Sequence, residues 1–232
     1  MTSNEGTPVA LVTGGSAGLG LALTSALTHD GWRVVTDARH GDALAAATAP
    51  LPRVTALPGD IRDPHHQQRL VDAVRRHGRL DLLVHNASEL GPMRPLADVV
   101  PGQFAEVLGT NLLAPLALTQ PLLPHLRASG GALVGISSDA AVAHYPAWGT
   151  YAASKAALDH LILTLAAENG LRGYAVDPGD LRTAMHQRAF PGEDISDRPL
   201  PDTVVPHLLA LITGDQPSGR YRVADLVAEI AR

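Results

Sequence analysis

Short apolar runs alternate along the chain with longer stretches in which apolar residues recur every three or four positions. The short runs have the length of buried strands, and the longer stretches have the period of amphipathic helices. The predicted strands cover residues 8–12, 33–36, 53–57, 80–85, 132–136, 171–176 and 220–223. Because strands that alternate with helices form parallel sheets, the sequence predicts an α/β fold. We expect a doubly wound Rossmann-type domain with a parallel sheet of about seven strands and helices on both faces.

The predicted helices carry start and stop signals. The first follows the first strand and ends at Gly31, and another begins at Asp63-Pro64 with a good cap and first turn and runs to about His77. Two more are expected over residues 151–169 and 204–212. A long apolar region over residues 101–127 also has helical character, but an interior proline removes a hydrogen bond, so we expect a kink or break there. The prolines concerned are Pro115, Pro121 and Pro124.

Size and composition limit the possible partners. The chain has 232 residues, which suits one domain over residues 8–232 behind a flexible tail of residues 1–7. The net charge is -5 and the arginines are dispersed, so we expect no nucleic-acid partner. No apolar run is long enough to span a membrane, the first residues lack a signal peptide's apolar core, and Cys is absent. These features predict a cytoplasmic protein with no membrane partner.

No metal site is expected. His65 and His66 are adjacent near the start of a helix and therefore diverge around it. We interpret them as a surface pair rather than as metal ligands.

A glycine-rich turn, Thr13 to Gly20, lies directly between the first strand and the first helix. Glycines allow a tight turn and close approach to a pyrophosphate, whose charge is stabilised by free N–H groups at a helix N-terminus. The segment Gly14-Gly-Ser16-Ala-Gly18 also fits the nucleophile elbow of α/β hydrolases. That elbow needs an oxyanion donor from an earlier strand-to-helix loop, and only one strand precedes Ser16. Dinucleotide binding is therefore favoured.

Tyr151 and Lys155 are spaced to meet on one face of a helix. Lys155 is the single lysine beside seventeen arginines. A positive charge close to a phenol favours the phenolate, and lowering its pKa from ~10 to about 7 takes roughly 4 kcal/mol. The pair predicts a general acid/base that works at neutral pH. The alternative is an ordinary pair on a helix surface, so the interpretation depends on the other motifs in the chain.

The chain resembles the short-chain dehydrogenase/reductase family from about Pro8 to Leu226. The matching residues keep the family's order and spacing, with Ser138 thirteen residues before Tyr151. They are Thr13-Gly14 with Gly18 and Gly20, Asp60, Asn86-Ala87, Asn111, Ser138, Tyr151 with Lys155, and Pro178-Gly179 with Thr183.

The resemblance implies hydride transfer between a nicotinamide and a small carbonyl or alcohol substrate. Tyr151 would move the proton, Lys155 would lower its pKa and hold the ribose, Ser138 would bind the substrate oxygen, and Asn111 would hold a relay water. The implied cofactor-binding residues are Gly14, Ser16, Gly18, Leu19, Gly20, Asp37, Arg39, Asp60, Ile61, Asn86, Ala87, Tyr151, Lys155, Pro178, Gly179 and Thr183. Residues expected to shape the substrate pocket are His144, Tyr145, Trp148 and the stretch from Arg182 to Arg198.

Cofactor choice is decided at the end of the second strand. The resemblance aligns the NAD-selecting acid with Ala38 and the NADP-selecting arginine with Arg39, and a guanidinium suits a phosphate. NADP is therefore favoured over NAD, although Asp37 could repel a 2′-phosphate. Two departures, His85 and Ser88, place side chains where the family prefers an amide or a glycine. They make cofactor affinity less certain.

Two further expectations concern assembly and class. The helices over residues 112–126 and 152–167 carry more apolar surface than one sheet face can cover. Relatives associate through these helices, so we expect a homodimer or homotetramer. The alternative to an enzyme is a non-catalytic dinucleotide-binding sensor or assembly protein of the same fold. A pure binder needs no proton relay, and the residues of one are present.

Overall fold

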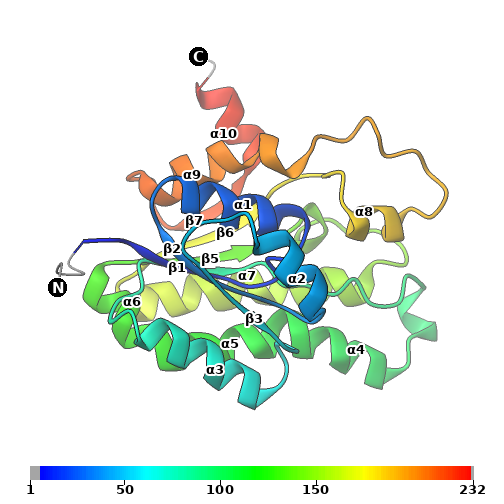
Figure 1. Cartoon of the computed structure of the whole chain (residues 1–232). Helices are drawn as coiled ribbons and strands as arrows, with labels where there is room; N and C mark the ends of the chain where they lie inside the picture. Colours follow the sequence, from blue (N-terminus) through cyan, green and yellow to red (C-terminus); the bar gives the residue numbers. More distant parts are fainter. Residues whose placement is uncertain (1–5, 231–232) are drawn as a thin grey trace.

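The computed structural model describes residues 6–230, and the side-chain environments as far as Val227. Its seven strands form one parallel sheet in the order β3-β2-β1-β4-β5-β6-β7 (Figure 1). Each predicted strand is present within two residues of its expected bounds. The strands are β1 (Val9–Val12), β2 (Arg33–Ala38), β3 (Val54–Pro58), β4 (Leu82–His85), β5 (Ala132–Ile136), β6 (Arg172–Asp177) and β7 (Gly219–Arg222). The expected fold class is confirmed.

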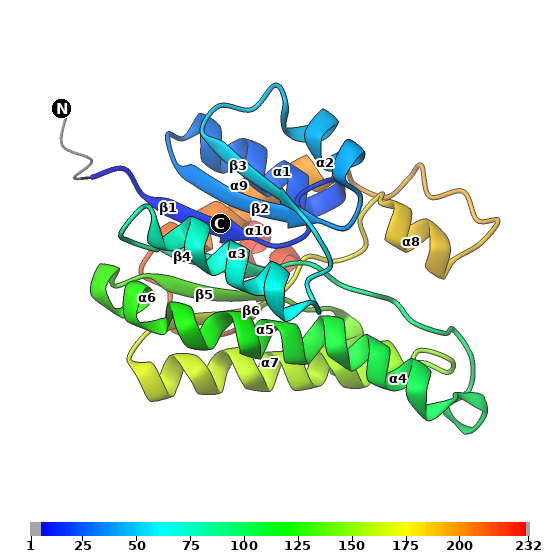
Figure 2. The ribbon, with the colours of Figure 1, turned by 60° about the horizontal axis from the view of Figure 1, so that its bottom comes forward.

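Helices cover both faces of this sheet. One face packs against α1 (Gly18–His29), α9 (Val205–Thr213) and α10 (Val223–Ile230). The other face packs against α3 (Pro64–Arg75), α5 (Ala114–Thr119), α6 (Leu123–Ser129) and α7 (Gly149–Asn169), as Figure 2 shows. Because both faces are covered, the central strands read as continuous apolar runs rather than as alternating ones. β1, β4 and β5 are buried at every position.

The strand order reverses between β1 and β4, and this reversal determines where a ligand can bind. β1 pairs with β2 on one side and with β4 on the other. The connections that leave the carboxyl ends of β1 and β4 therefore run in opposite directions and leave a crevice between them. The glycine-rich turn follows β1, and Asn86 follows β4.

The long apolar region breaks where prolines interrupt it, as predicted. α4 (Pro101–Leu108) is followed by a π-helical turn at Gly109–Leu113, and then by α5 and α6. Pro115 explains the break, because it has no N–H to donate to the carbonyl of Asn111 four residues earlier. The helix therefore changes pitch around Asn111.

Some elements were not predicted. They are α2 (Gly41–Thr48), α8 (Ala184–Ala189), α10, and 3₁₀ turns at Leu96–Asp98, Gln120–Leu122, Asp139–Ala141 and Pro201–Thr203. α7 also begins two residues before Tyr151. Most of the expected tail, residues 1–5, lies outside the described residues. Within the described part of the chain, no helix is long and apolar enough to cross a membrane.

The interpretation of His65 and His66 as a surface pair is wrong for His66. His65 is exposed, but His66 is buried with 2% of its surface exposed. The ring of His66 fits against Gly59, where any Cβ would come within 2.3 Å of Nδ1. Successive helix residues diverge, so only one of the two histidines points toward the sheet.

Candidate active site

A cleft of about 380 Å³ runs along the carboxyl edge of the sheet. Of the predicted site residues, it is lined by Gly14, Ser16, Gly18, Leu19, Asp37, Arg39, Asp60, Ile61, Asn86, Ala87, Ser138, Trp148, Tyr151, Lys155, Pro178, Gly179 and Thr183. Four predicted residues do not line it: Gly20, Asn111, His144 and Tyr145. The cleft thus joins the glycine-rich turn to the Tyr151 helix.

The glycine-rich turn is shaped to accept a phosphate group. Gly14 and Gly18 have positive φ angles of 75° and 57°, which favour glycine. A Cβ on Gly20 would lie 2.3 Å from the Gly14 carbonyl oxygen, so Gly20 permits the turn to fold against α1 without lining the cleft. Ala17 caps α1 without a side-chain hydrogen bond, and the first turn carries no acid. The uncapped helix N-terminus therefore fits a dinucleotide pyrophosphate.

Thr13 and Asn86 fix this turn to β4. The Thr13 hydroxyl accepts hydrogen bonds from the backbone N–H groups of Asn86 and Ala87, each at 3.0 Å. In return, the Asn86 amide donates to the carbonyls of Thr13 at 2.9 Å and Gly14 at 3.2 Å. The side chain of Asn86 thus braces the turn as well as lining the cleft.

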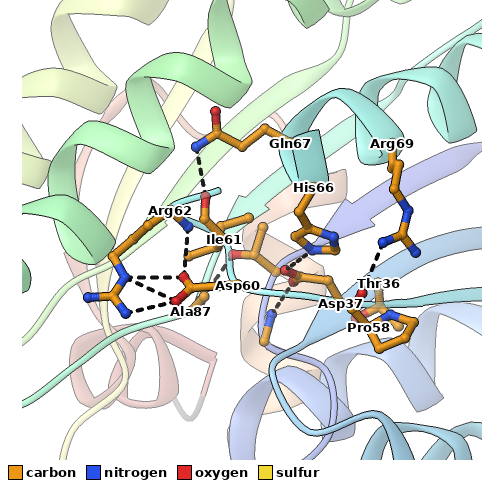
Figure 3. Close-up of polar contacts among 12 residues, drawn as sticks. Thr36, Asp37, Pro58, Asp60, Ile61, Arg62, His66, Gln67, Arg69 and Ala87 are labelled. Atoms are coloured by element: carbon orange, nitrogen blue, oxygen red, sulfur yellow. Dashed lines mark hydrogen bonds and ion pairs between the residues drawn. The ribbon is translucent and has the colours of Figure 1, made fainter. Parts of the chain in front are cut away.

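Charged groups gather at the end of the cleft near β2 and β3. Arg62 binds the Asp60 carboxylate through its backbone N–H and its guanidinium, and this hydrogen bonding holds the pKa of Asp60 below its ordinary value (Figure 3). Arg39 forms an ion pair with Glu89 across the cleft, and 54% of its side chain remains exposed. A guanidinium so exposed at the rim can reach an anionic ligand.

The two departures from the family pattern occupy different environments. His85 is buried away from the cleft, where its Nε2 lies 2.8 Å from the Thr119 hydroxyl. Because Thr119 donates to the carbonyl of Pro115, the His85 ring is the donor in this contact. Burial lowers the pKa of His85 to about 3, so the ring is neutral at physiological pH. Ser88 lines the cleft and donates to the Asn111 side chain at 3.2 Å.

Tyr151 lies at the inner end of the cleft, and 8% of its surface is exposed. Burial, together with the negative charges of Asp177 and Asp139, raises its pKa to about 12, while hydrogen bonds with Ser138 and Ser88 act in the opposite direction. Ser138 follows β5 and also accepts from the Ala140 N–H at 3.2 Å. The phenol therefore holds its proton at neutral pH and sits beside two hydroxyls.

Lys155 differs from its predicted place beside the Tyr151 oxygen. Its Nζ donates to the Ile136 carbonyl at 2.7 Å and lies 5.5 Å from the centre of the Tyr151 ring. Only 1% of its surface is exposed, and burial lowers its pKa to about 8 despite the charge of Asp159. Lys155 was expected to lower the pKa of Tyr151, but in the protein it does not do so. Burial of the phenol has the larger effect.

Asn111, in the π-helical turn, supports the site without lining the cleft. Its side-chain oxygen accepts from the Glu89 N–H at 2.8 Å, and its amide donates to the Glu89 carbonyl and to the Ser154 hydroxyl. Ser154 in turn donates to the carbonyl of Tyr151 at 2.7 Å. The Asn111 side chain is thus fully engaged in joining the loop after β4 to α7.

Sequence reasoning missed an arginine that supports the site from β7. Arg220 donates to the Ser138 carbonyl at 2.8 Å and to Asp159 at 3.1 Å, and its guanidinium lies 3.6 Å from Asp177. Burial raises the pKa of both carboxyl groups, and the charge of Arg220 opposes that effect. Arg220 therefore balances two buried acids beneath Ser138 and Lys155. No motif in the sequence identifies it.

Only one of the three predicted substrate residues faces the cleft. Trp148 lines it and packs edge to face on Tyr151, with ring centres 5.9 Å apart. Phe190, from the segment after α8, packs on Trp148 at 5.7 Å. Tyr145 is exposed at the rim and donates to Asp139 at 2.7 Å, while His144 is exposed. Phe190 belongs to the stretch from Arg182 to Arg198, which was expected to shape the pocket, but it does not itself line the cleft.

Comparisons with known proteins agree with this geometry. The family model described as short chain dehydrogenase matches residues 8–194. An uncharacterized oxidoreductase of Escherichia coli strain K12, YciK, is 32% identical over 218 residues, covering 89% of this chain and 86% of that protein.

Two similar crystal structures contain a nucleotide. A short-chain dehydrogenase from Shigella flexneri complexed with NADP has a TM-score of 0.85 at 30% identity and covers 94% of this chain and 97% of its own. A short-chain dehydrogenase from Escherichia coli CFT073 complexed with NADPH also has a TM-score of 0.85 at 30% identity. It covers 93% of this chain and 96% of its own.

Proposed function

The chain belongs to the short-chain dehydrogenase family, and we propose that it is an NADP-dependent oxidoreductase that interconverts a carbonyl and a secondary alcohol. The observation that carries the proposal is the continuity of the cleft. Arg39 and the uncapped N-terminus of α1 lie along one part of it, and Ser138, Tyr151 and Lys155 lie at its inner end. One bound dinucleotide could therefore reach from the arginine to the phenol.

Tyr151 is the proposed general acid in the direction of carbonyl reduction. Its phenol is protonated at neutral pH because burial raises its pKa to about 12. Bound NADPH would supply the hydride to the substrate carbon. Tyr151 gives its proton to the substrate oxygen as negative charge develops there, and Ser138 donates a hydrogen bond to the same oxygen.

Lys155 and Asn111 have the supporting roles. The ammonium of Lys155 lies beside the ring of Tyr151 and would hold the nicotinamide ribose. The side chain of Asn111 joins the loop that contains Ser88 to α7, the helix that carries Tyr151. The backbone carbonyl of Asn111 has no α-helical hydrogen bond, because Pro115 has no N–H to donate. This carbonyl is the proposed place for a relay water.

A panel of ketones and alcohols tests the function. Purified protein should oxidise NADPH in the presence of at least one ketone, read as the loss of nicotinamide absorbance. Nucleotide binding without turnover on any member of a broad panel would instead favour a non-catalytic sensor. The panel would also identify the substrate class, which the ring of Trp148 at the cleft constrains.

Arg39 tests the preference for NADP. Replacing Arg39 by Gln removes the exposed guanidinium and should weaken NADPH binding by about 10- to 100-fold, while NADH binding changes less than about threefold. Fluorescence titration with both nucleotides gives the two dissociation constants. Arg69→Gln is the control, since Arg69 is exposed on α3 outside the cleft. An equal loss for both nucleotides would contradict the assignment of Arg39 to the 2′-phosphate.

We also propose that the protein is a homodimer or homotetramer. α5 and α7 lie on the outer side of one helical layer in Figure 2. The exposed apolar residues there are Leu113 in the π-helical turn, Ala117 on α5 and Ala153 on α7, and Leu161 on α7 is half-buried. Light scattering at micromolar concentration should give a multiple of the 24.2 kDa chain mass, and Ala117→Arg should shift the protein toward the monomer. A monomeric mass for the unmodified protein would exclude this assembly.

The proposed compartment is the cytoplasm. The chain has no cysteine and therefore depends on no disulfide, which suits a reducing environment. Localisation of a tagged full-length chain by microscopy or fractionation tests this proposal.

A further inference from the structure

Asp37 braces the glycine-rich turn from below. Its side-chain Oδ1 accepts the N–H of Gly14 at 2.9 Å, and its backbone carbonyl accepts the N–H of Gly15 at 2.8 Å. Only 2% of its surface is exposed, although it lies at the end of β2 next to the part of the cleft that contains Arg39. One carboxylate oxygen is therefore directed into the protein by the turn itself.

His66 engages the other carboxylate oxygen. It projects from the first turn of α3 toward Asp37, as Figure 3 shows, and its Nε2 lies 3.0 Å from Oδ2. The ring is as deeply buried as its partner, and its Nδ1 has no hydrogen-bond partner among residues 6–230. A proton on Nδ1 would be a buried donor without an acceptor, so the neutral ring carries its proton on Nε2 and donates it to Asp37.

We propose that His66 is a specificity-determining residue, which favours NADP by keeping the Asp37 carboxylate turned away from the adenosine ribose. This inference rests on the proposed function. With both carboxylate oxygens bound inside the protein, Arg39 is the charged side chain at the end of β2 that reaches the rim. A 2′-phosphate then meets a cation instead of an anion.

Loss of His66 reverses this arrangement for a simple physical reason. Oδ2 of Asp37 would remain buried without a donor, which is unfavourable for a carboxylate. Rotation toward the cleft gives that oxygen water or a ribose hydroxyl as a partner. A carboxylate in that position accepts a hydrogen bond from the 2′-hydroxyl of NADH and repels the 2′-phosphate of NADPH.

The test compares the dissociation constants of NADPH and NADH, measured by fluorescence titration on the full chain. In His66→Leu the ratio of the two constants should move by roughly tenfold toward NADH. His65→Leu is the matched control, because the neighbouring histidine is exposed on the same helix turn and should leave the ratio unchanged. Adding Asp37→Asn to His66→Leu removes the released charge and should cancel the shift.

Several results would overturn the proposal. Equal weakening of both nucleotides in His66→Leu would mean that the histidine only supports the fold. If His66→Leu does not fold, the single variant Asp37→Asn tests the proposal through the same ratio of dissociation constants. A ratio change below about threefold supports a carboxylate that faces inward, whereas a shift of about tenfold toward NADPH shows that the charge already faces the ribose. Binding of neither nucleotide by the unmodified protein would count against the proposed function itself, not against His66.

Discussion

Replacing Tyr151 by Phe should lower the rate of carbonyl reduction by about 10²- to 10⁴-fold and leave NADPH binding within about threefold of the unmodified protein. The phenol is the group proposed to give its proton to the substrate oxygen, and a phenyl ring cannot do so. The ring itself packs on Trp148 in an edge-to-face contact, which Phe preserves. Steady-state rates and nucleotide titration on the same preparation separate chemistry from binding.

Tyr145→Phe is the matched control for this experiment. Tyr145 lies at the rim outside the cleft, and its hydroxyl donates to Asp139 rather than facing the site. Its loss should change the rate less than about threefold, since the hydrogen bond is exposed. A Tyr151→Phe protein with nearly full activity would refute the assignment of Tyr151 as the proton donor.

The ionisation of Tyr151 predicts how the rates of carbonyl reduction and alcohol oxidation depend on pH. Since burial raises the pKa of Tyr151 to about 12, the phenol stays protonated below that value, and carbonyl reduction should vary little with its ionisation through the neutral range. Alcohol oxidation needs the phenolate, whose fraction rises about tenfold per pH unit below the pKa. The oxidation rate should therefore climb with pH, and Tyr151→Phe should abolish that climb.

The sequence predicts most of the sheet because each buried parallel strand is a continuous apolar run. It also indicates which residues gather at the cleft, since the carboxyl ends of parallel strands meet at one edge. Thr13, Asn86 and Ser138 each follow a predicted strand. The structure places Asn86 and Ser138 on the cleft and Thr13 in the bonds that fix its glycine-rich turn. Short helices such as α2 and α8 were missed because so few residues give too little periodicity to distinguish them from loops.

What the sequence did not reveal depends on contacts between distant segments. The Arg220 guanidinium reaches Asp159 across 61 positions of the chain, and no spacing rule connects them. The burial of His66 depends on the absence of a side chain at Gly59, which leaves room for the ring. The charge states of Tyr151 and Lys155 also follow from burial, which the motif alone does not contain.

Lys155→Met should reduce activity at neutral pH by roughly 10²-fold, because it removes the positive charge beside the phenol and the proposed donor to the ribose. Because Lys155 does not lower the pKa of Tyr151, alcohol oxidation by the variant should keep the same rise with pH as in the unmodified protein. His160→Met, on the exposed side of the same helix, is the control and should retain activity. Full activity in Lys155→Met would contradict the role of the ammonium.

The same variant should have an opposite effect on stability, because the Lys155 ammonium is buried. Burial lowers the pKa of Lys155 from 10.5 in the unfolded chain to about 8 in the folded one. Between these values the unfolded chain binds the proton and the folded chain does not, so the free energy of unfolding contributed by Lys155 rises with pH, by on the order of 3 kcal/mol in total. Below pH 8 the protein carries the full penalty of a buried charge. Chemical denaturation from pH 7 to 10.5 should therefore show the stability of the unmodified protein rising relative to Lys155→Met, with the variant the more stable at pH 7. A constant difference across that range would mean that Lys155 is not desolvated as its 1% exposure and its bond to the Ile136 carbonyl indicate.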